Sequence, residues 1–237
     1  MRVALLGGTF DPPHRGHIAL ARLARKRLSL DRVLVAPVAA QPLKRPSPSA
    51  SFADRVAMAR LAFAGEPNTE ISLIDAPRVD GSSNYTIDTI SALRRELAPS
   101  DTLFCILGAD SFLAIRNWHR AADLLLACDF IVGARPGFDL AQAASALPKE
   151  ISAKPMPSEI PQTGILELTA GRKAPRARAS ARSATHLYLL LDLAEDVSAT
   201  QIRADIQAAL SGIAQHHSIL PSSVAKYIRV HHLYEHL

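Results

Sequence analysis

Cysteine and tryptophan are scarce in this sequence, which has two cysteines and one tryptophan among 237 residues. Both cysteines lie in apolar runs, Cys105 in LFCIL and Cys128 in LLLACDF, where a reduced and buried thiol is the usual occupant. Without a cysteine pair at ligand spacing, the histidines at 216, 217, 231, 232 and 236 do not form a typical zinc motif. We therefore predict no disulfide and no metal ion held by protein side chains.

Long apolar runs are also lacking. The first run ends at Gly7 after a few residues, too early for the apolar part of a signal peptide, and no later run reaches the roughly 20 residues of a membrane span. The 16 prolines and 11 glycines exclude a collagen-like or wholly disordered chain, and an apolar content of 48% allows one sizeable core. We expect a folded cytoplasmic protein that does not enter a membrane.

The excess of positive charge is local. The chain has 27 basic and 22 acidic residues, and five of the basic ones occur in the acid-free stretch RKAPRARASAR at 172–182. Subtracting these five leaves 22 basic against 22 acidic residues, so the rest of the chain is neutral. An extended basic face of the kind that binds nucleic acid is therefore not indicated, and we expect no nucleic-acid partner.

Short runs rich in Val, Ile and Leu alternate with segments of helical period. This alternation is typical of an α/β fold, here a doubly wound parallel sheet with helices on both faces. Strands are predicted at 2–6, 32–38, 70–75, 102–107, 130–133 and 187–191, and helices at 17–28, 52–64, 86–97, 121–127 and 140–147.

Regular patterning weakens after residue 147, where prolines become frequent. We predict a long, partly mobile basic loop at about 149–185. Two helices follow the last predicted strand. Ser198 or Thr200 can cap the first, which ends near Gly212, and Pro221 opens the second.

The string GGTFDPPHRGH, at 7–17, follows the first predicted strand, and open parallel sheets bind ligands at the carboxyl ends of their strands. Gly8 lets the backbone approach an anion, while Thr9 and Phe10 offer main-chain N–H groups. Gly16 removes a side chain where the helix begins. The string indicates a phosphate site. It does not match G-x-G-x-x-G, and no acidic residue closes the second strand, which disfavours a dehydrogenase.

His14 and His17 are three residues apart, so on a first helical turn their rings share one face. Both could then donate to phosphoryl oxygens that gain charge during a transfer reaction. Taken singly, each could instead be a surface histidine beside a tight glycine turn. The ordered set of strand, glycines and histidines favours the phosphate site.

This ordered string resembles the H-x-G-H signature of the nucleotidyltransferase superfamily, and its GGTFDPPHxGH form resembles the bacterial nicotinate-nucleotide adenylyltransferases. The resemblance extends over 2–234, including the closing PSSVAKYIRVHHLY, with only the region at about 149–185 left outside it. It implies a Rossmann-like nucleotidyltransferase fold, with a single domain over 1–237 and a C-terminal helical extension. It also implies transfer of AMP from ATP to nicotinate mononucleotide in NAD biosynthesis, with Mg2+ on the triphosphate.

The stretch VSATQIRADI, at 197–206, resembles the family's I-S-S-T-x-I-R element. The resemblance places Ser198, Thr200, Ile202 and Arg203 at a helix N-terminus beside the triphosphate, where the helix dipole and the guanidinium favour negative charge. Ala199 replaces the family's second serine, which removes one hydroxyl contact. A capped amphipathic helix with an exposed arginine is the alternative interpretation.

Two other stretches resemble the family's ring-binding motifs. LGAD implies that Gly108 and Asp110 face the adenosine ribose, with Asp110 as a helix N-cap as the alternative. NYTIDTI implies that Tyr85 and Thr86 meet the pyridine carboxylate, although a helix cap explains these residues nearly as well. Trp118 matches the family's tryptophan that stacks on the nicotinate ring, whereas a lone tryptophan is more often a core residue.

The resemblance assigns two more cations to phosphates. Arg135 matches the arginine of the family's x-x-R-P-G. After the second strand the family has P-P-H-K and this chain has QPLK, so Leu43 replaces the histidine and Lys44 would act on the acceptor phosphate by charge alone. Arg55 and Met58 fit the R-x-x-M that follows in relatives.

The reaction implied is a direct displacement with ATP and nicotinate mononucleotide as partners and with His14, His17, Lys44 and Arg203 as catalytic donors. Adenylyl transfer to nicotinamide mononucleotide or to phosphopantetheine is the alternative within the superfamily. A nucleotide-binding regulatory or nucleic-acid-associated protein that binds through 172–182 is the alternative outside it. The sequence leaves the oligomeric state open, a homo-oligomer included.

Overall fold

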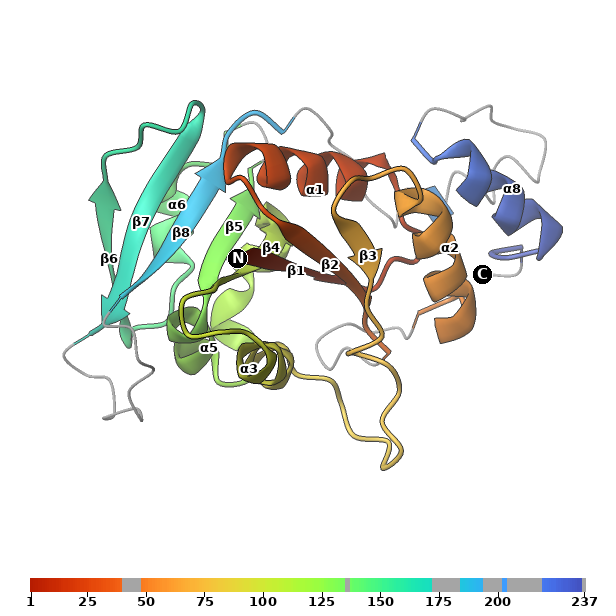
Figure 1. Cartoon of the computed structure of the whole chain (residues 1–237), viewed down its shortest axis with the longest axis horizontal. Helices are drawn as coiled ribbons and strands as arrows, with labels where there is room; N and C mark the ends of the chain where they lie inside the picture. The colour runs from red at the N-terminus through yellow and green to blue at the C-terminus, as the bar shows by residue number, and fades with distance from the viewer. Residues whose placement is uncertain (40–47, 135–136, 172–183, 194–201, 204–218, 236–237) are drawn as a thin grey trace.

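A computed structural model of the chain describes residues 1–39, 48–134, 137–171, 184–193, 202–203 and 219–235. Within these ranges the strands form one sheet with the order β3-β2-β1-β4-β5-β8-β7-β6 (Figure 1). The six strands from β3 to β8 in that order pair in parallel, and β7 and β6 are added in antiparallel fashion. The strands are β1 Arg2–Gly8, β2 Arg32–Pro37, β3 Thr69–Ile71, β4 Thr102–Gly108, β5 Asp129–Gly133, β6 Ile151–Met156, β7 Thr163–Ala170 and β8 Thr185–Leu190.

Helices cover both faces of this sheet, with α1 on one side and α3 and α5 on the other (Figure 1). Side chains of β1 alternate between two cores, with Leu5 packed beneath α3 and α5 and Leu6 beneath α1, α2 and α8. The helices are α1 Arg15–Arg27, α2 Phe52–Phe63, α3 Thr86–Glu96, α4 Ala109–Leu113, the 3-10 helix η1 Ile115–Asn117, α5 Ala121–Ala127, α6 Leu140–Ser145 and α8 Ser222–Val230.

The predicted doubly wound α/β sheet is confirmed. The six predicted strands all occur, and the strand order reverses between β2-β1 and β4, which is where such folds bind ligands. The third strand is shorter than predicted, Thr69–Ile71 rather than 70–75. Its pairing partner β2 ends soon afterwards, and the chain turns at the bond from the Ala76 N–H to the Leu73 carbonyl, 2.9 Å.

The prediction of a long loop at 149–185 is wrong for much of that range, because β6 and β7 form an antiparallel pair there. Leu166 and Leu168 alternate into the core with period two, a strand signal that the surrounding prolines concealed. Pro155 is tolerated because β6 is the edge strand and can spare a backbone donor. The basic residues 172–183 lie outside the described residues.

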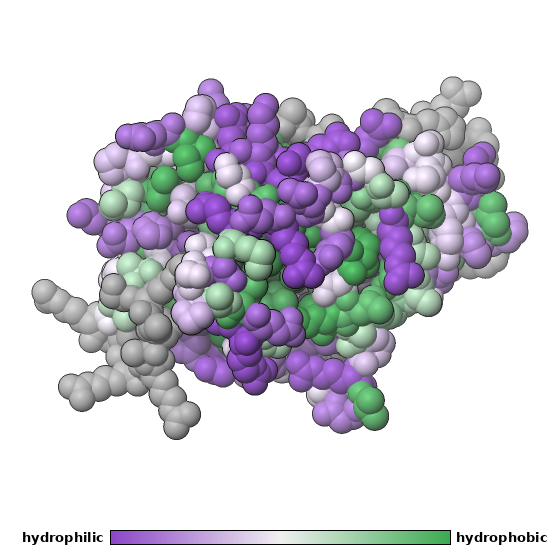
Figure 2. All heavy atoms as spheres, in the orientation of Figure 1, coloured by the Kyte–Doolittle hydropathy of each residue, from purple (hydrophilic) through white to green (hydrophobic). Residues whose placement is uncertain are grey.

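Hydrophilic side chains cover most of the face seen in Figure 2, with apolar side chains in smaller groups between them. Among the described residues, no helix combines the length and the apolar character that a membrane crossing requires. Cys105 and Cys128 are both buried, as predicted, and burial raises the pKa of the Cys105 thiol to about 12.

Candidate active site

The predicted phosphate turn lies at the carboxyl end of β1, between the carboxyl ends of β2 and β4. Phe10 takes a left-handed backbone conformation with φ of 50°, and its ring is 1% exposed. That ring packs against His17 and Phe63, with centroid distances of 4.9 and 6.3 Å. A β-carbon on Gly8 would come within 3.1 Å of the Phe10 ring, so the tight turn favours glycine there.

His14 and His17 meet at the start of α1, as predicted. His14 is the N-cap residue, and its main-chain N–H donates to Nδ1 of His17 at 3.2 Å. The two ring centroids lie 3.7 Å apart. This hydrogen bond fixes the orientation of the His17 ring and makes Nδ1 the acceptor, so that Nε2 is the ring nitrogen that carries the proton.

Burial controls the charge of His14. The side chain is 6% exposed, and burial lowers its pKa to about 4, so the imidazole is neutral near pH 7. Its Nδ1 is buried and has no hydrogen-bond partner among the described residues. Unsatisfied buried polar atoms are rare in native proteins and often mark a ligand site. The His14 environment therefore fits a phosphate oxygen as the absent partner.

Asp11 connects the turn to three distant segments. Its carboxylate accepts the main-chain N–H groups of Ser49 at 2.8 Å and Ala50 at 3.1 Å, and the hydroxyl of Tyr234 at 2.8 Å. Its carbonyl accepts Nη1 of Arg203 at 2.6 Å. Asp11 and Tyr234 were not among the predicted site residues, although both lie in motifs that carry the resemblance. Their buried side chains thus hold together the segments that contain the other site residues.

Arg55 joins the loops that follow β1 and β2. Its side chain is 1% exposed and donates to the carbonyls of Thr9 at 2.7 Å, Val38 at 2.8 Å and Ala50 at 3.3 Å. Burial lowers the pKa of Arg55, whereas the charge of Asp11 raises it. The carbonyl dipoles stabilise the buried guanidinium. The arginine of the R-x-x-M motif thereby fixes the loop after β1 against the loop after β2.

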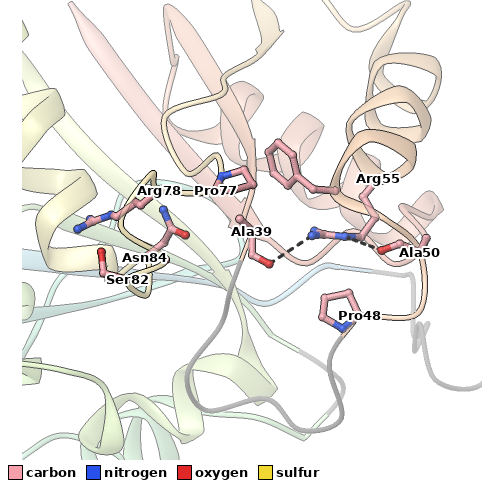
Figure 3. Close-up of a pocket in the computed structure, with 10 residues that line it drawn as sticks. Ala39, Pro48, Ala50, Arg55, Pro77, Arg78, Ser82 and Asn84 are labelled. Carbon is pink, nitrogen blue, oxygen red and sulfur yellow. Dashed lines mark hydrogen bonds between the residues drawn. The ribbon is translucent and has the colours of Figure 1, made fainter.

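A cavity of about 310 Å³ lies beside Arg55, between the loop after β2 and residues 77–84 (Figure 3). Arg78, Ser82 and Asn84 line its far side. Asn84 is 6% exposed and donates to the Ala76 carbonyl at 3.2 Å, while its Oδ1 has no partner among the described residues. Because Asn84 immediately precedes Tyr85, the cavity adjoins the predicted acceptor residues.

The predicted acceptor residues gather at the start of α3 and the end of η1. Tyr85 is the N-cap of α3, and Thr86 is the first residue of that helix. The Tyr85 ring stacks on His119, the residue after Trp118, with centroids 4.2 Å apart. Trp118 is half buried against the core beneath α3 and α5 and lines a second cavity of about 310 Å³. It thus has a packed side and an accessible side.

At the carboxyl end of β4, Gly108 is the N-cap of α4 and Asp110 lies in the helix's first turn. The alternative of Asp110 as N-cap is therefore wrong. Asp110 is exposed at the same sheet edge as the β1 turn. Ile202 is 3% exposed, and the neighbouring Arg203 bonds the Asp11 carbonyl in the turn. Four predicted site residues lie outside the described residues: Lys44, Arg135, Ser198 and Thr200.

The reversal of strand order and the histidine-containing turn at the carboxyl end of the first strand define an α/β nucleotide-binding protein. The model of the cytidylyltransferase-like family matches residues 5–205. A probable nicotinate-nucleotide adenylyltransferase of Laribacter hongkongensis is 35% identical over 233 residues, covering 98% of this chain and 94% of that protein. The corresponding protein of Gloeobacter violaceus is 36% identical over 234 residues, covering 99% and 96%.

Solved structures support the fold. The Plasmodium falciparum nicotinic acid mononucleotide adenylyltransferase complexed with NaAD superposes with a TM-score of 0.64 at 17% identity, covering 99% of this chain and 97% of that one. The same enzyme complexed with APC gives 0.62 with equal coverage. The chain therefore belongs to the cytidylyltransferase-like family and, within it, to the nicotinate-nucleotide adenylyltransferases.

Proposed function

We propose that this protein transfers AMP from ATP to nicotinate mononucleotide, forming nicotinate adenine dinucleotide and pyrophosphate. Full-length similarity to nicotinate-nucleotide adenylyltransferases supports the reaction. The observation that carries it to this chain is the paired histidine site at the end of β1, where His14 has a buried ring nitrogen without a partner among the described residues. We place the reaction in the cytoplasm, where NAD biosynthesis would draw on dissolved ATP.

The chemistry needs no protein nucleophile. A phosphate oxygen of nicotinate mononucleotide attacks the α-phosphorus of ATP, the new oxygen to α-phosphorus bond forms, and the bond to the β-phosphate bridging oxygen breaks with release of pyrophosphate. Catalysis then consists of positioning and of charge neutralisation. We assign the donors to His14, His17, Lys44 and Arg203.

His14 and His17 act as hydrogen-bond donors in this scheme. The lowered pKa of His14 keeps it uncharged in the unliganded protein, and an adjacent triphosphate would favour protonation because it brings negative charge close to the ring. Nδ1 of His17 accepts the main-chain N–H of His14, so Nε2 is its protonated ring nitrogen. Each ring thus offers a hydrogen bond where charge develops on the phosphoryl group.

We assign the remaining ATP contacts to the turn and to two neighbouring helix starts. The residues are Gly8, Thr9, Phe10, Gly16, Gly108, Asp110, Ser198, Thr200 and Ile202. We assign the acceptor to Lys44, Tyr85, Thr86, Trp118 and Arg135. The stacked Tyr85 and His119 rings beside Trp118 support an aromatic acceptor, because offset aromatic stacking provides a flat surface for a pyridine ring.

Mg2+ is the proposed cofactor, and it enters with ATP. Among the residues described, no group of three or more His, Cys, Asp or Glu side chains is placed to hold a metal ion. The Asp11 carboxylate, the buried acid of the turn, already accepts three hydrogen bonds. We propose that the metal is held mainly by phosphate oxygens and water, which is the usual state of Mg2+ on nucleotides. When bound, the ion neutralises charge on the leaving pyrophosphate.

Turnover on three acceptors tests the proposal. The protein is assayed for pyrophosphate release with ATP and Mg2+ against nicotinate mononucleotide, nicotinamide mononucleotide and phosphopantetheine, each over a range of concentrations. We expect the highest kcat/KM with nicotinate mononucleotide. A clear preference for phosphopantetheine, or no transfer to any of the three, would overturn the assignment.

A further inference from the structure

We propose that Tyr234, near the end of the chain, is a positioning residue for ATP, which acts by holding Asp11 and, through it, the phosphate turn and Arg203. The proposal rests on the proposed function, since it concerns ATP binding by the same site. Tyr234 lies 223 positions from Asp11 in the sequence, yet its hydroxyl donates to Oδ1 of Asp11 at 2.8 Å. Its side chain is 6% exposed.

The backbone at Tyr234 is held in a costly conformation. Its φ is 70°, in the left-handed region that a bulky residue rarely adopts, and such a residue persists only where its surroundings fix it. After α8 the chain folds back through a hydrogen bond from the Leu233 N–H to the Ile228 carbonyl, 3.0 Å. This return is what brings Tyr234 to the Asp11 carboxylate. The C-terminal segment also meets the turn where the Arg15 N–H donates to the Ile219 carbonyl at 3.0 Å.

Asp11 contacts both Tyr234 and Arg203, the residue proposed to bind the phosphates. Its side chain is 4% exposed, so each hydrogen bond to the carboxylate carries the full effect of a buried charge. Nη1 of Arg203 bonds the Asp11 carbonyl and lies 3.9 Å from Oδ2 of the same residue. If the tyrosine hydroxyl is removed, the carboxylate loses one of the three groups that hold it, so Asp11 and the Arg203 guanidinium that donates to its carbonyl are held less firmly. The guanidinium is then placed less well for the β- and γ-phosphates.

The hydroxyl remains a donor over the working pH range. Burial, and then the charge and hydrogen bond of Asp11, raise the pKa of Tyr234 well above its ordinary value. The phenol therefore stays protonated and remains the donor to the Asp11 side chain.

Tyr227 provides a matched control in the same segment. Its hydroxyl donates to Oδ1 of Asp54 at 3.0 Å and so joins α8 to the N-terminus of α2. Both tyrosines thus link the C-terminal segment to an aspartate of the sheet domain. Removing either hydroxyl should loosen α8 in a general way. Only the partner of Tyr234 lies in the phosphate turn, so only Tyr234→Phe should cause a selective loss of ATP binding.

The experiment compares full-length wild type, Tyr234→Phe and Tyr227→Phe in steady-state assays, with ATP and the acceptor varied in turn. We expect Tyr234→Phe to raise the KM for ATP about tenfold, because Asp11 then holds the turn and Arg203 less firmly around the triphosphate, and to leave the KM for the acceptor within about twofold. Tyr227→Phe should leave both KM values within about twofold. Equal changes in both KM values, or no change with Tyr234→Phe, would overturn the proposal.

Direct binding separates this proposal from the proposed function. Titration calorimetry with α,β-methylene-ATP measures the nucleotide site without any acceptor, so it gives a result even if nicotinate mononucleotide is the wrong substrate. We expect the same tenfold weakening with Tyr234→Phe and with Asp11→Asn, which keeps the shape of the side chain but removes its charge. Should Tyr234→Phe not fold, Asp11→Asn decides, and wild-type affinity in that variant would refute the role of the Asp11 charge.

Discussion

Replacing Arg55 with methionine tests how the site is held together. The guanidinium is 1% exposed and bonds the carbonyls of Thr9 and Val38 at 2.7 and 2.8 Å. Arg55→Met keeps the apolar stem but leaves these two carbonyls without their donor, at a cost of about 1–3 kcal/mol each. The wild-type protein has to remove the guanidinium from water on folding, and the methionine variant does not, which offsets part of this cost. We therefore expect a net loss of about 3 kcal/mol in the free energy of unfolding.

Calorimetry and denaturant unfolding measure this loss. For a domain of this length, about 3 kcal/mol corresponds to a fall in Tm of roughly 6–12 °C. Because Arg55 connects the loops after β1 and β2, the KM values for both substrates should rise together. The control is Arg60→Met on the exposed side of the same helix, for which we expect less than about 0.5 kcal/mol. A loss below 1 kcal/mol in Arg55→Met would refute the view that this arginine organises the site.

Three further outcomes are expected. The pKa of His14 is about 4 in the folded protein against 6.5 for an ordinary histidine, so the unfolded chain binds more protons between these pH values. The free energy of unfolding should therefore fall as the pH drops from about 6.5 to 4, by up to roughly 3 kcal/mol from this group. In pH-dependent calorimetry, His14→Gln should lose this contribution to the pH dependence of stability. Trp118→Ala should raise the KM for nicotinate mononucleotide about tenfold with little change for ATP, whereas Trp118→Phe should retain most of the affinity; equal effects on both substrates would indicate a core role alone. Deleting residues 172–182 should preserve turnover, and a parallel loss of turnover and of RNA or DNA affinity would favour the nucleic-acid alternative.

The parts of the fold that were predictable from sequence are those with strong local periodicity. The helix at 121–127 was predicted with the bounds it has, and the central strands within about two residues, because a fully buried parallel strand is a continuous apolar run. The β6 and β7 pair was missed because prolines interrupt an alternation that is short and half exposed. In an edge strand that interruption costs little, but the sequence does not say which strand is the edge.

In the candidate site too, the features set by local spacing could be predicted from the sequence, and those set by tertiary packing could not. His14 and His17 could be paired from their spacing alone, since three residues on a helix start fix their relative placement. The contact of Asp11 with Tyr234 could not, because it spans nearly the whole chain and depends on how α8 packs against α2. The burial that lowers the pKa of His14 is likewise a property of tertiary packing, to which no local pattern corresponds.

The most direct test of the central claim is the turnover of His17→Ala with ATP and nicotinate mononucleotide. The claim is that the turn at the end of β1 is where AMP is transferred, with His17 donating to the phosphoryl group. We predict a loss on the order of a hundredfold or more in kcat, with circular dichroism and Tm close to those of the wild type. Turnover near the wild-type value in a folded His17→Ala protein would contradict the account.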